Sequence, residues 1–268
     1  MPITNQIPRR RQQSICPLRQ SADVSKQSPD VCKQSPGSLP AVIKRMCGKY
    51  QKYQERKILY QILCFGDSNT HGYNGETQGR FSWEQRWTGI LARRLGPEYR
   101  VIEEGLNGRT TGFTEHGKKY RDPVPYLAPC MLSHMPLDLV AVMLGTNDTK
   151  PVFNASPEEI ARSMRRLMLR VRNYLQVKEQ KRRVLLISPV PMTTSVLCSG
   201  IEFDLSSVEK SRRLAPLYQT LAKELEVDFW DAGSAGIQLC GDGCHFSEQG
   251  HRQFAERMEE KVREILFS

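Results

Sequence analysis

The sequence has no long apolar segment. Hydrophobic residues make up 39% of its 268 residues, but no run approaches the roughly 20 consecutive apolar residues with which a helix crosses a bilayer. The first thirty residues also lack the apolar core of a secretory signal. We therefore expect no membrane-spanning segment and no membrane partner.

Close pairs of cysteines are almost absent as well. Of the eight cysteines, Cys240 and Cys244 alone lie close together, and a chain of this length does not need disulfides to hold a core. This favours a reduced, cytoplasmic protein. A zinc site built from these two thiols with His245 and His251 is disfavoured, because C-x3-C-H fits no common zinc spacing. We expect no metal and no other cofactor.

Acidic residues are scarce at one end of the chain. Residues 1–57 carry 12 Lys and Arg against 3 Asp and Glu, whereas residues 58–268 carry 27 against 26. Residues 1–40 are rich in Gln, Ser, Pro and Arg and have no helical or strand periodicity, and residues 1–57 as a whole are predicted to form a disordered basic extension. An organelle transit peptide and a true start at Met46 remain as alternatives. Because the segment has no interleaved aromatic residues, we expect no specific nucleic-acid partner.

From Ile58 onward, short apolar runs alternate with amphipathic stretches. This pattern is typical of β-α-β units, and it predicts one three-layer α/β domain over residues 58–268 with a parallel sheet. The predicted strands cover residues 58–65, 99–104, 137–144, 184–188 and 227–230, and the predicted helices cover residues 83–95, 157–178, 209–225 and 248–266.

Ligand sites in such sheets form where loops leave the carboxyl ends of the strands. The loop after the first predicted strand contains Gly66-Asp67-Ser68, a sharp turn that would expose the Ser68 hydroxyl, although the G-x-S-x-G elbow of lipases is not matched. The next loop contains Gly105-x-x-Gly108, in which Gly108 lets a backbone N–H approach a substrate oxygen. The absence of G-x-G-x-x-G argues against a dinucleotide site.

The loops after the third and fifth predicted strands complete the candidate site. Asn147 offers a carboxamide donor, which could form an oxyanion hole together with backbone N–H groups of the two earlier loops. Asp242 lies three residues before His245, so it can orient the imidazole and stabilise its protonated form. A single Gly-Asp-Ser turn is weak evidence, but four such loops in order predict an acyl-transfer site.

These four segments, in this order, resemble the sequence blocks of the SGNH (GDSL-like) hydrolase superfamily. Stretches such as LDLVAVMLGTNDTK and VIEEGLNGRTT are similar to its arylesterase and acyltransferase branch. The resemblance implies a flavodoxin-like fold with a five-stranded parallel sheet. It also implies a catalytic triad of Ser68, Asp242 and His245, and an oxyanion hole formed by the backbone N–H groups of Ser68 and Gly108 and the side chain of Asn147, with no metal.

The function implied by this resemblance is serine esterase activity on small carboxylic esters, such as aryl or alkyl acetates. The reaction would pass through an acyl-enzyme intermediate, with acyl transfer to alcohols as a side activity. Two alternatives remain: a carbohydrate acetyl esterase, and a catalytically silent module that binds through its basic extension.

Two features of the chain bear on how far the resemblance extends. By resemblance, the segment 118–129 contributes to homo-oligomer contacts, and its three prolines predict a rigid loop rather than a helix. Asn69 stands where Leu is usual after the serine, and its smaller, polar side chain predicts altered packing beneath the turn rather than lost catalysis.

Overall fold

The structure is a computed structural model that describes residues 59–175, 183–200 and 202–267. The extension predicted for residues 1–57 lies outside the described residues. The last three residues of the helix predicted for 157–178, residues 176–178, lie outside them as well. Within the described ranges, no helix is both long enough and apolar enough to cross a bilayer.

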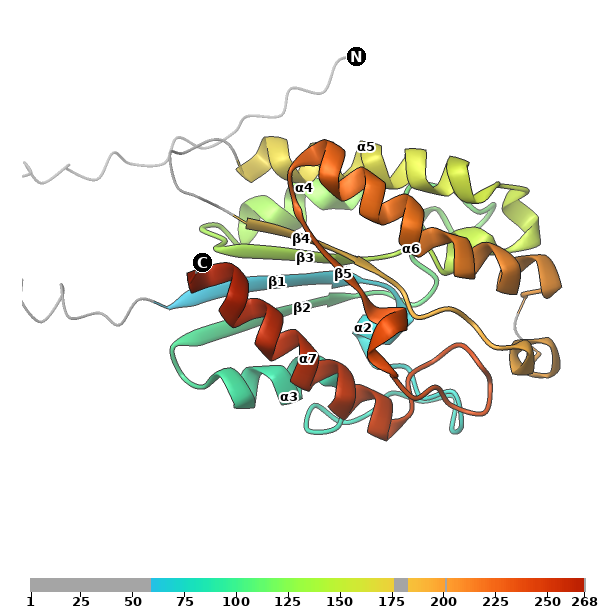
Figure 1. Cartoon of the computed structure of the whole chain (residues 1–268), viewed down its shortest axis with the longest axis horizontal. Coiled ribbons are helices and arrows are strands. Elements are labelled where there is room, and N and C mark those ends of the chain that lie inside the picture. Colours follow the sequence, from blue (N-terminus) through green and yellow to red (C-terminus); the bar gives the residue numbers. More distant parts are fainter. Residues whose placement is uncertain (1–58, 176–182, 201, 268) are drawn as a thin grey trace, which may run out of the picture. The chain divides into compact units, whose positions relative to one another are not determined.

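Five parallel strands form one sheet in the order β2-β1-β3-β4-β5 (Figure 1). The strands are β1 (Tyr60–Gly66), β2 (Tyr99–Gly105), β3 (Leu139–Met143), β4 (Arg183–Ser188) and β5 (Asp228–Asp231). At the carboxyl end of β1, Gly66 is level with Gly105 of β2 and Met143 of β3. The expected flavodoxin-like sheet is confirmed, and the loop after β1 leaves the sheet between the loops after its two neighbours.

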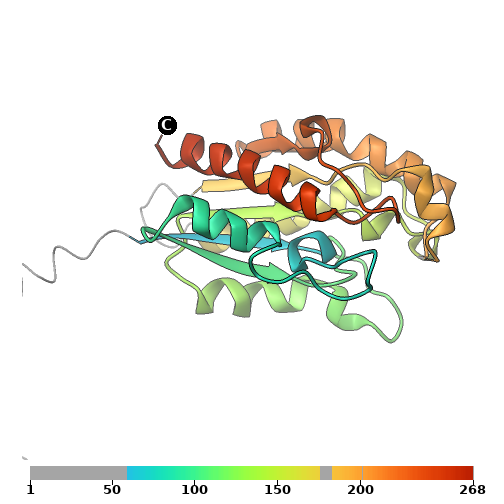
Figure 2. The same ribbon diagram turned by 90° about the horizontal axis from the view of Figure 1, so that it is seen from below.

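Helices cover both faces of this sheet, as Figures 1 and 2 show. One face carries α4 (Val124–Ser133), α5 (Pro157–Leu175) and α6 (Leu205–Leu225), and the other carries α3 (Trp87–Leu95) and α7 (Glu248–Phe267). The shorter helices are α2 (Ser68–His71), η3 (Lys119–Arg121), η4 (Asn147–Thr149), η5 (Pro151–Phe153), η6 (Thr194–Cys198) and η7 (Ala232–Ala235). The three-layer α/β arrangement is therefore confirmed.

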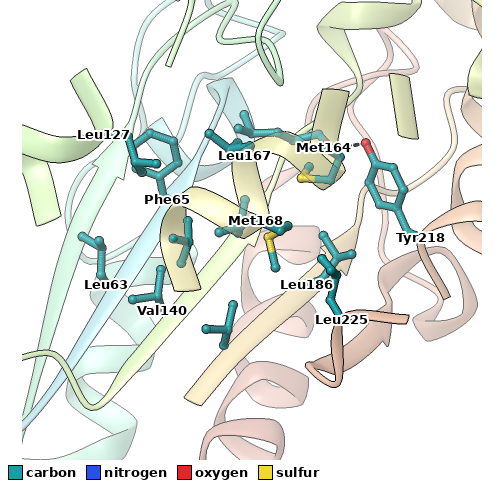
Figure 3. Close-up of a cluster of buried hydrophobic side chains, with 14 of the residues drawn as sticks. Leu63, Phe65, Leu127, Val140, Met164, Leu167, Met168, Leu186, Tyr218 and Leu225 are labelled. Atoms are coloured by element: carbon teal, nitrogen blue, oxygen red, sulfur yellow. Dashed lines mark hydrogen bonds between the residues drawn. The ribbon is translucent and has the colours of Figure 1, made fainter. Parts of the chain in front are cut away.

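Alternation along the strands divides the core into two layers. In β1, Leu63 and Phe65 belong to the cluster beneath α4, α5 and α6, whereas Ile62 and Cys64 belong to the cluster beneath α3 and α7. Figure 3 shows the first cluster, in which the hydroxyl of the buried Tyr218 donates to the Leu144 carbonyl over 3.1 Å. This hydrogen bond ties α6 to the end of β3, directly before the loop that carries Asn147.

The start of β1 and the end of α7 lie together at the edge remote from the strands' carboxyl ends. The ring of Tyr60 meets the ring of Phe267 edge-on, with 5.7 Å between their centroids. Tyr60 also stacks on Tyr99 of β2, with 5.2 Å between centroids. The first strand is thus anchored at its amino end by aromatic contacts with its neighbour and with the last helix.

Three helices differ from their predicted positions. α3 begins at Trp87, four residues after the predicted start at residue 83. The rigid loop predicted for 118–129 is wrong, because α4 begins at Val124 and contains Pro129. The proline at its first turn removes no helical hydrogen bond, and the lost bond at Pro129 is offset by burial of Leu127 and Met131. α6 begins at Leu205, four residues before the predicted start, because the Asp204 carboxylate caps it by accepting from the Ser207 N–H at 2.9 Å.

Candidate active site

Ser68 is the first residue of α2, directly after the turn that follows β1. The turn is held by Asp67, whose carboxylate accepts a hydrogen bond from the Asn69 N–H at 3.0 Å. Burial raises the pKa of Asp67 to about 6, against the effect of that hydrogen bond. Ser68 keeps 8% of its surface exposed and lines a cavity of about 270 Å³.

Ser68, His245 and Asp242 form a continuous chain of polar contacts. His245 Nε2 lies 3.0 Å from Ser68 Oγ, and His245 Nδ1 lies 2.7 Å from Asp242 Oδ2. The other oxygen of Asp242 accepts from the backbone N–H groups of Cys244 at 2.9 Å and His245 at 3.0 Å. Burial alone would raise the pKa of Asp242, but these hydrogen bonds outweigh it and hold that pKa below its usual value.

Asn69 connects the serine turn to the histidine loop. Its side-chain Nδ2 donates to the Cys244 carbonyl at 3.3 Å, and its Oδ1 accepts from the Phe246 N–H at 2.8 Å. The Asn69 carboxamide therefore bonds the backbone on both sides of His245, and it is 5% exposed. The prediction that Asn69 only alters packing missed this role, because its partners lie about 175 residues away in the sequence.

The two other predicted loops meet Ser68 across a cavity of about 270 Å³. Gly108 and Asn147 line this cavity together with Ser68 and His245, so the structure brings these predicted site residues together. Gly108 has a φ of 78°, a conformation that favours glycine. Asn147 Nδ2 donates to the Arg109 carbonyl at 3.2 Å, which orients the amide beside the Gly108 loop.

Asp148 joins the loops that follow β2 and β3. Its Oδ1 accepts from both the backbone N–H and the hydroxyl of Thr111, at 2.8 and 2.6 Å. Burial raises the pKa of Asp148 to about 7, against the effect of these hydrogen bonds. Arg109 adds a second link, since its guanidinium donates to the carbonyl oxygens of Gly66 and Glu104 at the ends of β1 and β2.

Comparison with known proteins identifies the family of this chain. The sequence profile of GDSL-like lipases and acylhydrolases matches residues 62–258. The chain belongs to the GDSL-like lipase/acylhydrolase family. The match covers the four loops that approach the cavity, from the turn that carries Ser68 to the loop that carries His245.

Solved structures similar to this chain include two esterases. The aryl esterase of M. smegmatis is 37% identical, with a TM-score of 0.70 over 77% of this chain and 100% of that one. A carbohydrate acetylesterase family member from Sinorhizobium meliloti is 36% identical, with a TM-score of 0.70 over 77% of this chain and 99% of the other.

A curated acetylxylan esterase from Xylanibacter ruminicola is 23% identical over 207 residues, or 73% of this chain. The chain spans 42% of the length of that relative.

Several residues at this GDSL-family site were not singled out from the sequence. The ring of Tyr73 lies against the His245 ring, with 4.5 Å between centroids. Gly75 lies against the Asp242 carboxylate, since a Cβ at this position would be 2.0 Å from Asp242 Oδ2. Lys150 and Arg121 line the cavity. Of these residues, the sequence pointed to the site only for Lys150, because it follows the predicted site residue Asn147 by three positions.

The remaining described histidines lie outside the cavity. His251 is fully buried, its Nδ1 accepts from the Trp87 N–H at 3.2 Å, and burial lowers its pKa to about 3. His71 does not line the cavity, although it belongs to the helix that carries Ser68.

Within the described ranges, one group offers three metal-ligating side chains. The ligand atoms of Glu104, Cys130 and His134 lie within 4.8 Å of one another. Glu104 is already engaged, because its carboxylate lies 3.2 Å from the His134 ring nitrogen and accepts from the Tyr126 hydroxyl at 3.0 Å. These contacts make the group a hydrogen-bonded cluster, and burial raises the pKa of its Cys130 thiol to about 12.

Proposed function

We propose that this GDSL-family chain is a serine carboxylic-ester hydrolase whose catalytic unit is residues 58–268. Ser68 is the nucleophile, His245 the general base and Asp242 the group that orients and stabilises His245. The observation that carries the proposal is the unbroken contact chain from Ser68 Oγ through the imidazole to the Asp242 carboxylate, at 3.0 and 2.7 Å. Such spacing suits proton transfer from a serine hydroxyl.

The reaction proceeds in two halves. Ser68 Oγ bonds to the ester carbonyl carbon while its proton passes to His245 Nε2. Collapse of the tetrahedral intermediate breaks the bond to the alcohol oxygen, which takes the proton from His245 and leaves. Water then attacks the acyl carbon while His245 again accepts a proton. Collapse of this second tetrahedral intermediate breaks the bond to Ser68 Oγ, which takes the proton back from His245 as the carboxylic acid is released. An alcohol that takes the place of water gives acyl transfer as a side activity.

The negative oxygen of the tetrahedral intermediate is stabilised by three N–H donors. These are the backbone N–H groups of Ser68 and Gly108 and the Asn147 side chain, which approach the cavity from three different loops. Donors fixed in advance cost little reorganisation when charge develops, and this is why oxyanion holes contribute strongly to acyl transfer. The hydrogen bond from Asn147 to the Arg109 carbonyl supports this fixed position.

A cavity of about 270 Å³ suits small acyl esters such as aryl or alkyl acetates. A carbohydrate acetyl esterase is the second candidate, and it is supported by the 36% identity to the Sinorhizobium meliloti carbohydrate acetylesterase family member. Initial rates on p-nitrophenyl acetate and on acetylated xylan would separate the two. Comparable rates on both substrates would favour the carbohydrate esterase.

The decisive experiment is intact-mass analysis after treatment with a fluorophosphonate, with turnover of p-nitrophenyl acetate measured in parallel. We expect one adduct on the wild-type chain, and neither adduct nor turnover in Ser68→Ala. Ser234→Ala is the matched control, because Ser234 is exposed in η7 and lies outside the cavity. Absence of both adduct and turnover in the wild type would favour the silent binding module.

The proposal also includes a homo-oligomer and a cytoplasmic location. Tyr120 and Leu132, in and just after the segment expected to contact another subunit, expose 61% and 58% of their surface. Exposed apolar side chains of this kind are suited to a subunit contact. Light scattering after gel filtration tests the oligomer, and a single-subunit mass would contradict it.

Fractionation of the source cells tests the cytoplasmic location.

A further inference from the structure

A buried ammonium group lies beside the proposed oxyanion hole. Lys150 follows η4, its backbone N–H donates to the Asn147 carbonyl at 3.3 Å, and its side chain lines the cavity. That side chain is 8% exposed. Removing a charge from water to this extent is costly unless a partner compensates for the lost hydration.

The charge of Lys150 is only weakly compensated by the contacts described. Its Nζ lies 3.5 Å from a carboxylate oxygen of Glu202, whose side chain is 63% exposed. This distance exceeds the roughly 2.7–2.9 Å of a good charge-assisted hydrogen bond. Nζ also lies 5.4 Å from the centroid of the Phe203 ring, a favourable but weaker contact. The ammonium group therefore keeps donor capacity beyond these contacts, and both Lys150 and Phe203 are among the residues that line the cavity.

A second cation, Arg121, also lines the cavity. The Arg121 guanidinium packs on Gly108, where a Cβ would be 2.4 Å from Arg121 Nε. Its Nη1 donates to Glu115 at 2.7 Å, but its Nε is buried and has no hydrogen-bond partner. Among the described residues that line the cavity there is no Asp or Glu. The space in front of Ser68 is therefore bordered by two cations and by no carboxylate.

We propose that the preferred substrate is an ester that carries an anionic substituent, such as a carboxylate, which Lys150 binds. The inference rests on the proposed esterase function and specifies its substrate class. The anion would complete the coordination of the ammonium group in place of the distant, exposed Glu202. Lys150 would thus determine specificity, and its contribution would depend on the charge of the substrate.

Matched substrates test the proposal at both ends of the ester. On the alcohol side, 4-acetoxybenzoate is compared with the neutral 4-acetoxybenzamide. On the acyl side, monophenyl adipate is compared with its neutral methyl ester. We expect the wild type to prefer the anionic member of at least one pair by about 10- to 100-fold in kcat/KM, mainly through KM, as a hydrogen bond to a charged group would give.

Three variants assign the preference to its cause. Lys150→Met should bring the ratio of anionic to neutral kcat/KM close to one, whereas Lys150→Arg should retain most of the preference. Lys210→Met is the matched control, because Lys210 lies close by, with Nζ 3.5 Å from the Thr149 carbonyl, but does not line the cavity. It should keep the wild-type ratio. Higher ionic strength should reduce the preference.

The outcomes separate this inference from the proposed function. A wild-type ratio near one for both pairs, or a ratio that Lys150→Met leaves unchanged, would overturn the inference alone. Equal losses on charged and neutral esters in Lys150→Met would also overturn it, because they would assign the lysine to the oxyanion rather than to the substrate. No turnover of any ester and no fluorophosphonate adduct would instead overturn the esterase itself.

Discussion

Replacing Asn69 with Leu tests what holds His245 against the serine turn. The Asn69 carboxamide donates to the Cys244 carbonyl at 3.3 Å and accepts from the Phe246 N–H at 2.8 Å. Leu is larger and has no polar group, so it fills the site but leaves both backbone partners buried without a hydrogen bond. Each buried polar group that loses its partner costs about 1–3 kcal/mol, so for the two groups together we expect the free energy of unfolding to fall by about 2–6 kcal/mol.

The same substitution should affect catalysis through position rather than binding. His245 Nε2 lies 3.0 Å from Ser68 Oγ, and misplacement of a reacting group by about 1 Å can cost about 100-fold in rate. We expect kcat for p-nitrophenyl acetate to fall by about 10- to 100-fold, with KM little changed.

Urea titration and steady-state kinetics measure the two effects. Asn173→Leu, at an exposed position of α5, is the matched control and should change neither quantity appreciably. If Asn69→Leu left both the free energy of unfolding and kcat at wild-type values, the carboxamide would not be what fixes the histidine loop.

Three further predictions concern the surroundings of the triad and the oxyanion hole. Gly75→Ala should lower kcat by about 100-fold, because the new Cβ would be 2.0 Å from Asp242 Oδ2, whereas Gly241→Ala has free space and serves as control; equal kinetics in the two variants would contradict this. Burial raises the pKa of Asp148 from 3.8 to about 7, so folding favours its protonated form. The free energy of unfolding should therefore fall as pH rises from about 4 to about 7, by up to about 1.4 kcal/mol per pH unit. Asp148→Asn should reduce that slope in urea titrations, and an unchanged slope would count against the assignment. Asn147→Ala should lower kcat by about 10²- to 10³-fold, as loss of one oxyanion donor does; a rate within a few-fold of wild type would exclude that role.

The parts of the site could be located from the sequence, because local patterns show where each strand ends along the chain. Apolar runs separated by amphipathic stretches predicted the parallel sheet, and a parallel sheet gathers the loops after its strands at one edge. Ser68, Gly108, Asn147 and His245 were each placed after a predicted strand, and all four line one cavity. Their chemistry could be grouped before any distance was known.

What the sequence did not reveal depends on contacts between distant segments. The two hydrogen bonds of Asn69 and the approach of Gly75 to Asp242 join residues more than 160 positions apart. The burial of Lys150 likewise depends on how the loops around it pack. α4 could not be predicted, because the local propensity of proline disfavours a helix. Packing of Leu127 against the sheet favours the helix despite the hydrogen bond lost at Pro129.

The contact between Tyr60 and Phe267 has a practical consequence for anyone who wishes to use this catalyst. Their rings meet with 5.7 Å between centroids, at the edge of the sheet remote from the cavity. An immobilising tag attached near Phe267 would therefore lie at the edge of the sheet opposite the loops that line the cavity. A short linker between the two positions would also make this fold a candidate for circular permutation, since joining them requires little added chain.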